Sequence, residues 1–259
     1  MISFVGAGPG APDLITLRGA ARLAAADVVV WAASLVPEAV LAHCRADVEV
    51  HDSKSMTFDD VTAVYERHPA AAIVRLHSGD PSVYSAIGEQ IDWCVEHERA
   101  FEIVPGVSSM SAAAAAIGRE LTAPGLAQSI VLTRLAHRTA ASVPEHESVA
   151  AYARVGGTMA VFLSAARPDE LQNELLTIGS QHGPATPAVI AHRVSWPDER
   201  IVRTSVGDLA EAVRTLGATT TVLVLVGDAV GDGPISTRSH VYAPTYAHSF
   251  RTTVTPPDA

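Results

Sequence analysis

The stretch Ile73-Val-Arg-Leu-His-Ser-Gly-Asp-Pro-Ser-Val-Tyr-Ser85 decides the fold that this sequence predicts. Its apolar beginning is typical of a buried strand, and the small residues that follow indicate a turn leading into a long helix over residues 83–98. Gly79 lets a ligand approach the backbone, Pro81 suits the first turn of a helix, and Asp80 can accept hydrogen bonds. In open parallel sheets, ligands bind beyond the carboxyl ends of the strands. We therefore expect a site at this turn.

Two further glycine-bearing loops follow short apolar runs in the same way, Gly6-Ala-Gly-Pro-Gly10 and Pro105-Gly-Val-Ser-Ser109. Strand and helix signals alternate through the first half of the chain, a pattern typical of right-handed βαβ units and a parallel sheet. The three loops are therefore predicted to meet at one sheet edge and to form one pocket. Asp80 alone would fit a helix cap equally well, but the hydroxyls of Ser108 and Ser109 favour a ligand site.

The pattern changes between Ile117 and Gly125, where glycines and a proline cluster, and we place a linker there. The chain beyond it predicts a second lobe with an antiparallel hairpin around the turn Ser195-Trp-Pro-Asp198. The last residues mix Ser, Thr, Pro, Tyr and His, which favours an extended tail. The predicted fold class is α/β, with two α/β lobes and a tail over residues 1–117, 118–235 and 236–259.

Composition and charge narrow the classes of function. The 259 residues suffice for a sizeable core, and the formal net charge is −10. Such an acidic chain is not expected to bind nucleic acid or an anionic membrane, because both favour clustered lysine and arginine. Cys44 and Cys94 stand apart, with no metal-ligand spacing, so we expect no metal and no disulfide. The absence of a signal peptide or membrane-length apolar run predicts a cytoplasmic protein.

The glycine run of residues 6–10 also satisfies a loose dinucleotide pattern, G-x-G-x-x-A. Its context disagrees, because Pro9 and Pro12 hold the chain as a loop until about Thr16, whereas a dinucleotide-binding helix begins inside the glycines. The place of a ribose-binding acid holds Ala32-Ala-Ser34. A nicotinamide oxidoreductase is therefore disfavoured, and we find no nucleophile elbow or phosphate-binding P-loop.

Polar residues at other strand ends give weaker signals. For His51, His77 and His192, a structural role is favoured over a ligand role. A basic group closes another predicted strand, and in so acidic a protein it is either ordinary surface or a binding site for carboxylates. It consists of Arg134, His137 and Arg138, and Lys54, the only lysine, is a candidate neighbour.

Three motifs combine with these signals: Val5-Gly-Ala-Gly-Pro-Gly10 with Asp13-Leu-Ile-Thr16, Arg75-Leu-His-Ser-Gly-Asp-Pro-Ser-Val-Tyr84, and Val104-Pro-Gly-Val-Ser-Ser109. Together, and in this order, they resemble the tetrapyrrole methyltransferases that use S-adenosylmethionine, almost end to end. A second set of segments resembles the family members that methylate C11 of precorrin-4 in cobalamin biosynthesis. These segments are Ala33-Ser-Leu-Val36, Leu132-Thr-Arg134, Phe162-Leu-Ser164, Ser195-Trp-Pro-Asp-Glu199 and Ser249-Phe-Arg251.

The resemblance implies a cofactor cleft between the two lobes, a tetrapyrrole substrate and a homodimer. The residues that it implies line S-adenosylmethionine are Pro9, Gly79, Asp80, Val83, Ser108 and Ser109 from the first lobe, and Leu163, Ser164, His192, Thr220 and Thr221 from the second. His192 departs from the family pattern, because a close relative is expected to have tyrosine at this position.

The resemblance also assigns roles toward the substrate. Lys54 matches the proposed proton donor of a related uroporphyrinogen methyltransferase, and we treat it as a catalytic candidate. Ala32 stands where that relative has a proton-accepting aspartate, so no base is carried over. The substrate carries many carboxylates, and we expect Lys54, Arg134, His137 and Arg138 to bind them.

Several alternatives stay open at this point. Within the family, one alternative is methylation of another ring carbon, and a second is methylation of the cobalt-containing substrate. Diphthine synthase is a more distant relative, and the segment Trp196-Pro-Asp198 argues against it. From another class, the chain would be a nonenzymatic protein that binds the cofactor or a tetrapyrrole without turnover.

Overall fold

The chain divides into two compact units, which are described separately below. The computed structural model describes residues 1–136, 143–234, 239–243 and 245–252. The first unit consists of Met1–Ile117, Ala191–Ile201 and Thr220–Leu223, and the second of Gly118–Ile190, Val202–Thr219 and Val224–Ala259. A single cut after residue 117 therefore omits two later segments that group with the first unit.

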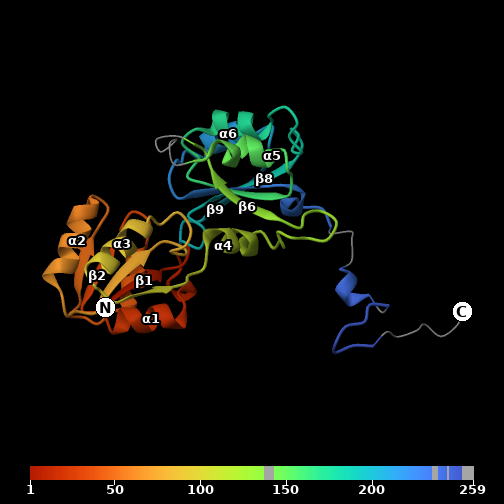
Figure 1. Ribbon diagram of the computed structural model, residues 1–259. Helices are drawn as coiled ribbons and strands as arrows, with labels where there is room; N and C mark the ends of the chain where they lie inside the picture. The colour runs from red at the N-terminus through yellow and green to blue at the C-terminus, as the bar shows by residue number, and fades with distance from the viewer. Residues whose placement is uncertain (137–142, 235–238, 244, 253–259) are drawn as a thin grey trace, which may run out of the picture. The chain divides into compact units, whose positions relative to one another are not determined.

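A five-stranded sheet with strand order β3-β2-β4-β1-β5 forms the centre of the first unit (Figure 1). Each neighbouring pair is parallel, as the alternation of strands and helices predicts. Strand β4, which precedes the turn Ser78-Gly79-Asp80-Pro81, lies in the middle of the sheet. The strands are β1 (Ile2–Gly6), β2 (Val28–Trp31), β3 (Glu49–Asp52), β4 (Ile73–His77) and β5 (Phe101–Val104).

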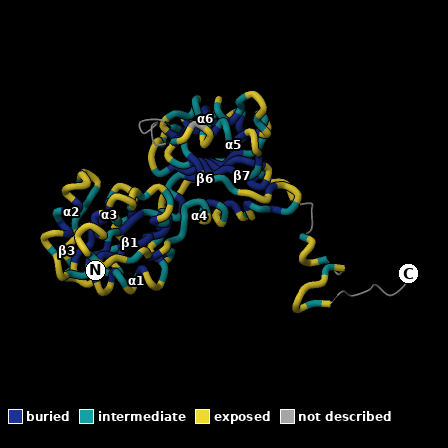
Figure 2. The backbone as a smooth tube through the Cα atoms, in the orientation of Figure 1, coloured by how far each residue is buried: buried dark blue, intermediate teal, exposed yellow. Residues whose placement is uncertain are grey.

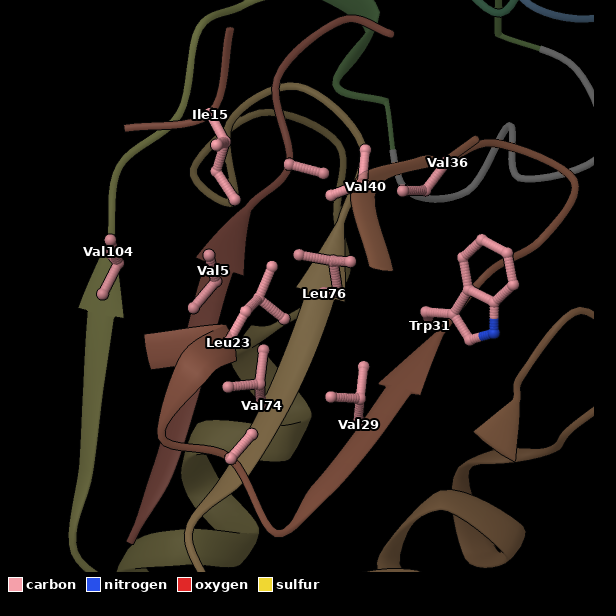
Figure 3. Packing of buried hydrophobic residues seen from close by; sticks show 12 residues of the cluster. Val5, Ile15, Leu23, Val29, Trp31, Val36, Val40, Val74, Leu76 and Val104 are labelled. Carbon is pink, nitrogen blue, oxygen red and sulfur yellow. The ribbon is translucent and has the colours of Figure 1, made fainter. Parts of the chain in front are cut away.

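One face of this sheet packs against helix α1 (Leu17–Ala24). Leu23 of the helix lies in one buried cluster with Val5, Val29 and Leu76 of three strands (Figure 3). Removing a side chain of this size from water contributes about 1.5–3 kcal/mol. The inner strands β1, β2 and β4 are mostly apolar because each of their faces meets a helical layer.

The other face packs against helices α2 (Phe58–Arg67) and α3 (Gly88–Glu96). Tyr65 and Trp93 of these helices share a buried cluster with Phe4 of β1. All five residues of β1 are buried, so this strand runs through the centre of the core (Figure 2). Helix α4 (Ser109–Ala116) then ends the long amino-terminal segment of the unit.

Capping side chains set the first residues of two helices. Thr57 and Asp60 form a reciprocal capping box at the start of α2, with N–H to side-chain oxygen distances of 2.9 and 3.2 Å. Thr16 caps α1 and accepts a hydrogen bond from the N–H of Gly19 at 3.1 Å. The chain before Thr16 is a loop with a short 3-10 turn, η1 (Pro12–Leu14), as the two prolines predict.

The helix predicted over residues 83–98 is wrong at its start. Helix α3 begins at Gly88, and the preceding residues form an irregular loop. Tyr84 and Ala86 lie in the left-handed region, with φ angles of 53° and 49°, and a right-handed helix does not pass through this conformation. Pro81 therefore begins a turn rather than a helix.

Another five-stranded sheet has the strand order β6-β7-β10-β8-β9, and most of it belongs to the second unit. The segments Ala191–Ile201 and Thr220–Leu223, which include the ends of β8, β9 and β10, group with the first unit. Strand β6 is parallel to β7, and β7 is antiparallel to β10. The N–H of Val206 donates to the carbonyl of Thr186 at 2.8 Å, while Arg200 lies beside His192, so β8 and β9 run in opposite directions. The strands are β6 (Ile130–Arg134), β7 (Thr158–Phe162), β8 (Pro187–His192), β9 (Arg200–Ser205) and β10 (Val222–Val226).

Helix α6 (Pro168–Leu175) contacts both α5 (Val149–Ala153) and α7 (Leu209–Leu216). The amide of Gln172 accepts a hydrogen bond from the N–H of Ala210 at 2.8 Å, which joins α6 to α7. The α/β fold class with two lobes is thus confirmed. Within the part of the chain that the structure describes, no helix combines the length and apolarity that a membrane crossing requires.

Candidate functional site

Three glycine-bearing loops meet at the carboxyl edge of the first sheet, as predicted. The loops after β1 and β4 exchange two backbone hydrogen bonds, in which Gly8 and Gly79 each donate to the other at 3.2 and 2.7 Å. The loop after β5 lies against both. A Cβ atom on Gly106 would lie 2.1 Å from the carbonyl oxygen of Gly79 and 2.8 Å from the Cα of Gly6. Only glycine permits this approach of three backbones.

Asp80 joins the loop after β4 to the loop after β5. Its Oδ2 accepts a hydrogen bond from the N–H of Gly106 at 2.8 Å, and its Oδ1 accepts bonds from both the N–H and the hydroxyl of Ser82. Partial burial alone would raise the pKa of Asp80, but the hydrogen bonds from Ser82 and Gly106 outweigh it and lower the pKa. The carboxylate is therefore ionised at neutral pH and acts first as a clamp between two loops.

The turn at Gly79 lies close to the start of α4. Gly79 has a φ of +65°, and a Cβ atom there would meet only ordinary contacts, the nearest with Ser108 and Ser109 at 3.9 Å. Ser108 caps α4 by accepting a hydrogen bond from the N–H of Met110 at 3.3 Å. The first N–H groups of a helix have no intrahelical partner and favour anionic or hydroxyl groups. The turn at Gly79 is therefore a neighbour of these N–H groups.

Pro9 lies under the turn between β8 and β9, a contact that the sequence did not predict. The indole Nε1 of Trp196 donates to the carbonyl of Pro9 at 3.0 Å, and the hydroxyl of Ser195 accepts from the N–H of Ala11 at 2.9 Å. A Cβ atom on Gly10 would lie 2.2 Å from Cδ1 of Trp196, so glycine is needed beneath the ring. The turn therefore fixes the conformation of the first glycine loop.

Arg193 also holds the indole. Its guanidinium carbon lies 4.1 Å from the centre of the Trp196 ring, and its Nε lies 3.1 Å from a carboxylate oxygen of Asp198. The turn is strained, because Arg193 and Ser195 have φ angles of 48° and 66°. The available sequence signal was the segment Ser195-Trp-Pro-Asp198 itself, which predicts a turn but not what the turn contacts.

We expect Trp196→Phe to weaken binding of the cofactor that the sequence predicts at the first glycine loop. The variant keeps an aromatic ring under Arg193 but loses the hydrogen bond to Pro9, which contributes about 0.5–1.5 kcal/mol. The dissociation constant should rise by a factor of about 3–10. Calorimetric titration with S-adenosylhomocysteine measures it. Trp93→Phe, at the buried contact with Tyr65, is the control, and an equal loss there would contradict a specific role for Trp196.

His192 and Thr221 lie at neighbouring strand ends within the first unit, which also contains Pro9 and Asp80. The carbonyl of Thr221 accepts a hydrogen bond from the N–H of Arg193 at 2.9 Å, so the residue after His192 is tied to this strand end. Partial burial, and then the charge of Arg200 at 3.3 Å, lower the pKa of His192. The imidazole is neutral at neutral pH. Thr220 precedes Thr221 and is exposed.

Leu163 and Ser164 follow β7 in the second unit and have different environments. Leu163 has a φ of 53° and an exposed fraction of 73%, although it is a large apolar residue. Ser164 is buried, and its hydroxyl donates to the carbonyl of Phe162 at 2.6 Å and accepts from the N–H of Leu135 at 2.9 Å. Of these two cofactor candidates, Leu163 exposes its side chain to solvent, whereas the side chain of Ser164 stabilises the end of β7.

Lys54 lies in the loop after β3, where it pairs with Asp52. Its Nζ lies 3.0 Å from Oδ2 of Asp52, while Oδ1 accepts hydrogen bonds from the N–H groups of Lys54 and Ala33 at 3.0 and 3.2 Å. The bond from the Lys54 N–H is the largest cause of the lowered pKa of Asp52. The lysine side chain is 60% exposed, so a substrate can reach it.

The other substrate candidates belong to the second unit. Arg134 is the last residue of β6 and is half-buried. His137 and Arg138 lie outside the described residues. Their assignment to the substrate carboxylates therefore stays a prediction. Val83, the remaining cofactor candidate, is half-buried in the first unit, where its N–H donates to the carbonyl of Asp80 at 3.2 Å.

Comparison with known proteins places this chain in a family. The model of the tetrapyrrole (corrin/porphyrin) methylases matches residues 1–210. The precorrin-4 C(11)-methyltransferase of Rhodococcus erythropolis is 42% identical over 228 residues, which cover 87% of this chain and 90% of that protein. The cobalt-precorrin-4 C(11)-methyltransferase of Methanocaldococcus jannaschii is 37% identical over 252 residues, which cover 96% of this chain and 95% of that protein.

Solved structures agree with these relatives. A cobalt precorrin-4 methyltransferase of cobalamin biosynthesis superposes with a TM-score of 0.84 at 39% identity, over 89% of this chain and 95% of that one. A uroporphyrin-III C-methyltransferase from Thermus thermophilus, complexed with S-adenosylhomocysteine, superposes with a TM-score of 0.72 at 29% identity, over 88% and 92% of the two chains. The chain belongs to the tetrapyrrole methylase family and is a methyltransferase. The predicted resemblance is confirmed.

Proposed function

We propose that this chain transfers a methyl group from S-adenosylmethionine to C11 of a precorrin-4 macrocycle in cobalamin biosynthesis. The observation that carries the proposal is similarity along nearly the whole chain to enzymes named for that one ring position. Relatives named for the metal-free and for the cobalt-containing substrate both share about 40% of their residues with this chain. The ring position therefore has stronger support than the metal state of the substrate.

The first unit carries groups that fit S-adenosylmethionine, which supplies an electrophilic methyl group on a sulfonium centre. The turn at Gly79 lies beside the N–H groups that begin α4, and these suit a carboxylate or ribose hydroxyl. We assign the cofactor to the candidates in this unit and to exposed Leu163. They are Pro9, Gly79, Asp80, Val83, Ser108, Ser109, His192, Thr220 and Thr221.

The contribution of the chain to the reaction is mainly positioning. Both carboxylate oxygens of Asp80 accept hydrogen bonds, and its lowered pKa makes it a weak base, so it orders the loops rather than acting as a general base. Ala32 offers no proton acceptor after β2. Holding a nucleophilic carbon about 3–3.5 Å from a methyl donor contributes several kcal/mol of barrier lowering without strong acid–base chemistry.

The substrate carboxylates require cations, and we assign Lys54, Arg134, His137 and Arg138 to them.

For Lys54→Met we expect KM for the macrocycle to rise by a factor of about 5–10, because one charge-assisted hydrogen bond is lost. Lys54→Arg should restore most of the affinity at low salt. If Lys54 is also the proton donor, kcat falls in both variants, so steady-state kinetics separate the two roles. An unchanged KM in Lys54→Met would contradict the assignment.

The test of the proposed function supplies labelled S-adenosylmethionine with enzymatically prepared precorrin-4 or cobalt-precorrin-4 in parallel reactions. Mass spectrometry counts the methyl groups transferred, and NMR of the product identifies the methylated carbon. Transfer to C11 is the expected result, and the faster substrate defines the metal state. Transfer to another carbon, or binding of the donor without any transfer, would overturn the proposal, and the second outcome would favour a nonenzymatic binding protein.

The same proposal includes a homodimer, because the resemblance implies one. Sedimentation velocity of the purified chain should give the mass of two copies of the 27.0 kDa protein. A single monomeric species at micromolar concentration would contradict this part without affecting the proposed reaction.

A further inference from the structure

Glu49, His51 and His68 form a cluster on the edge strand β3 and at the end of α2. Nε2 of His51 lies 2.7 Å from Oε1 of Glu49, and Nε2 of His68 lies 3.4 Å from the same oxygen. The three candidate ligand atoms all lie within 4.8 Å of one another. The two imidazole rings are inclined by 59°, with centres 6.4 Å apart. Two imidazoles and one carboxylate thus converge on one small volume.

The fold explains why these side chains meet. Glu49 and His51 are two residues apart on β3 and pair in register with Val28 and Val30 of β2. Residues paired in this way point to the same face of a sheet, and those two valines belong to the cluster that packs against α2. His68 follows the last residue of α2, so the helix ends above the side chains of Glu49 and His51.

The cluster is held by rigid backbone. The N–H of Glu49 donates to the carbonyl of Asp27 at 3.0 Å, and β3 is paired with β2 along its length. The N–H of His68 donates to the carbonyl of Tyr65 at 3.3 Å, and the guanidinium of Arg99 donates to the carbonyl of His68. Ligands presented by regular elements need little reordering when they bind a metal.

The electrostatics of the position favour a cation. Helix α2 has ten residues, and its C-terminal end carries partial negative charge directly at His68. Glu49 adds a carboxylate, which is half exposed, while the side chains of His51 and His68 are only 20% and 23% exposed. An ion would therefore enter from the side of Glu49. Glu49 is the first residue of β3, so the cluster lies toward the amino end of the strand, whereas Lys54 and the glycine loops follow the carboxyl ends.

We propose that Glu49, His51 and His68 form a binding site for a divalent late transition-metal ion of the zinc class. Zinc bonds of about 2.0–2.1 Å in a tetrahedral arrangement place neighbouring ligand atoms about 3.3 Å apart. The separations of 2.7 and 3.4 Å between Glu49 and the two imidazoles bracket this value, and every pair of ligand atoms lies within 4.8 Å, so side-chain rotations complete the site. Two imidazoles and a carboxylate leave the fourth position to water.

The ligand set selects the class of metal. Imidazole suits zinc, copper, nickel and cobalt, whereas magnesium and calcium prefer sites made of oxygen ligands. Both imidazoles would coordinate the ion through Nε2, which carries no proton in the complex. A bound ion would join the exposed edge strand of the sheet to α2, and this would rigidify the edge.

The test uses the full-length, tag-free chain after chelator treatment. Calorimetric titration with zinc chloride should give one ion per chain, with a dissociation constant at or below about 1 μM. Titration with cobalt(II) should give the visible bands of a four- or five-coordinate ion. His51→Gln and His68→Gln should each weaken zinc binding by a factor of about 100 or more, because each removes one of three ligands. His146→Gln, at an exposed position outside the cluster, is the matched control.

Two further measurements do not depend on how the variants fold. Zinc at 100 times the dissociation constant should raise the Tm of the wild-type chain by roughly 5–10 °C. X-ray absorption at the zinc edge should show two imidazoles and oxygen ligands. Absence of stoichiometric binding, or binding that survives in both histidine variants, would overturn the proposal. Neither outcome bears on methyl transfer, because none of the three residues belongs to the proposed catalytic site.

Discussion

Replacing Gly106 by alanine is expected to destabilise the protein by about 3–5 kcal/mol and to lower its Tm by roughly 10–15 °C. The added Cβ would lie 2.1 Å from the carbonyl oxygen of Gly79, 2.8 Å from the Cα of Gly6 and 3.0 Å from its carbonyl carbon. All three neighbours are backbone atoms of central strand ends, so no side chain can rotate away. The loops must separate instead.

Separation of the loops also breaks the hydrogen bond from the N–H of Gly106 to Asp80, which is 2.8 Å long. The loop after β5 carries Ser108 and the start of α4, so binding of S-adenosylhomocysteine should be lost even at temperatures where the variant stays folded. Urea unfolding measures the stability, and calorimetry measures the binding. Both effects have one steric cause.

Gly88→Ala is the matched control for this prediction. It makes the same chemical change at the first residue of α3, where a Cβ atom would meet nothing within 4 Å. Alanine is the better helix former, so stability should stay the same or rise by up to about 1 kcal/mol. If Gly106→Ala behaved like Gly88→Ala, the close packing of the three loops would not exist in solution.

The sequence was sufficient to predict the parallel sheet and its loops. The short apolar runs that form β1 and β4 are each followed by a loop with glycines. In parallel strands these loops must lie at the same edge of the sheet. The capping box at Thr57 was also predictable, because its hydrogen bonds connect residues three positions apart. Local patterns therefore determined both the elements and the edge where the candidate site lies.

Long-range contacts and unusual backbone conformations were not predictable. Trp196 is 187 positions from Pro9, and hydrophobic periodicity carries no information about such pairs. The late start of α3 depends on Tyr84 and Ala86, which adopt positive φ although neither is glycine or asparagine. His68 likewise joins His51 only through the packing of α2 on β3. For these features the tertiary structure overrides the local signal.

The stability of the protein should fall as the pH decreases from 6.5 toward 3, and His77 should account for much of this loss. Burial, and then the positive charge of Arg75, lower the pKa of His77 to about 3 from an ordinary value of 6.5. The ring lies beside Phe4, and its Nε2 has no hydrogen-bond partner among the described residues. The folded state therefore holds the neutral imidazole.

The direction of the effect follows from proton uptake. Between pH 6.5 and 3 the unfolded chain binds a proton at His77 and the folded chain does not, so the unfolded state gains stability as the pH falls. Above pH 6.5 both states are neutral, and the effect disappears. The difference between the two pKa values corresponds to about 4–5 kcal/mol once both states are protonated, and to about 2 kcal/mol between pH 7 and pH 5.

His77→Leu is expected to flatten this dependence by about 2 kcal/mol between pH 7 and pH 5. At pH 7 its stability should equal or exceed that of the wild type, because a buried nitrogen without a partner is replaced by an apolar group. The bond from the N–H of Ala7 to the backbone carbonyl of residue 77, 2.7 Å long, is kept. Urea unfolding at both pH values measures the change.

His146→Leu, at an exposed histidine, is the control and should leave the pH dependence of stability unaltered. An equal pH dependence in wild type and His77→Leu would show that His77 is not the group that titrates. Some acid sensitivity should remain in His77→Leu, since burial also lowers the pKa of His182 in the second unit.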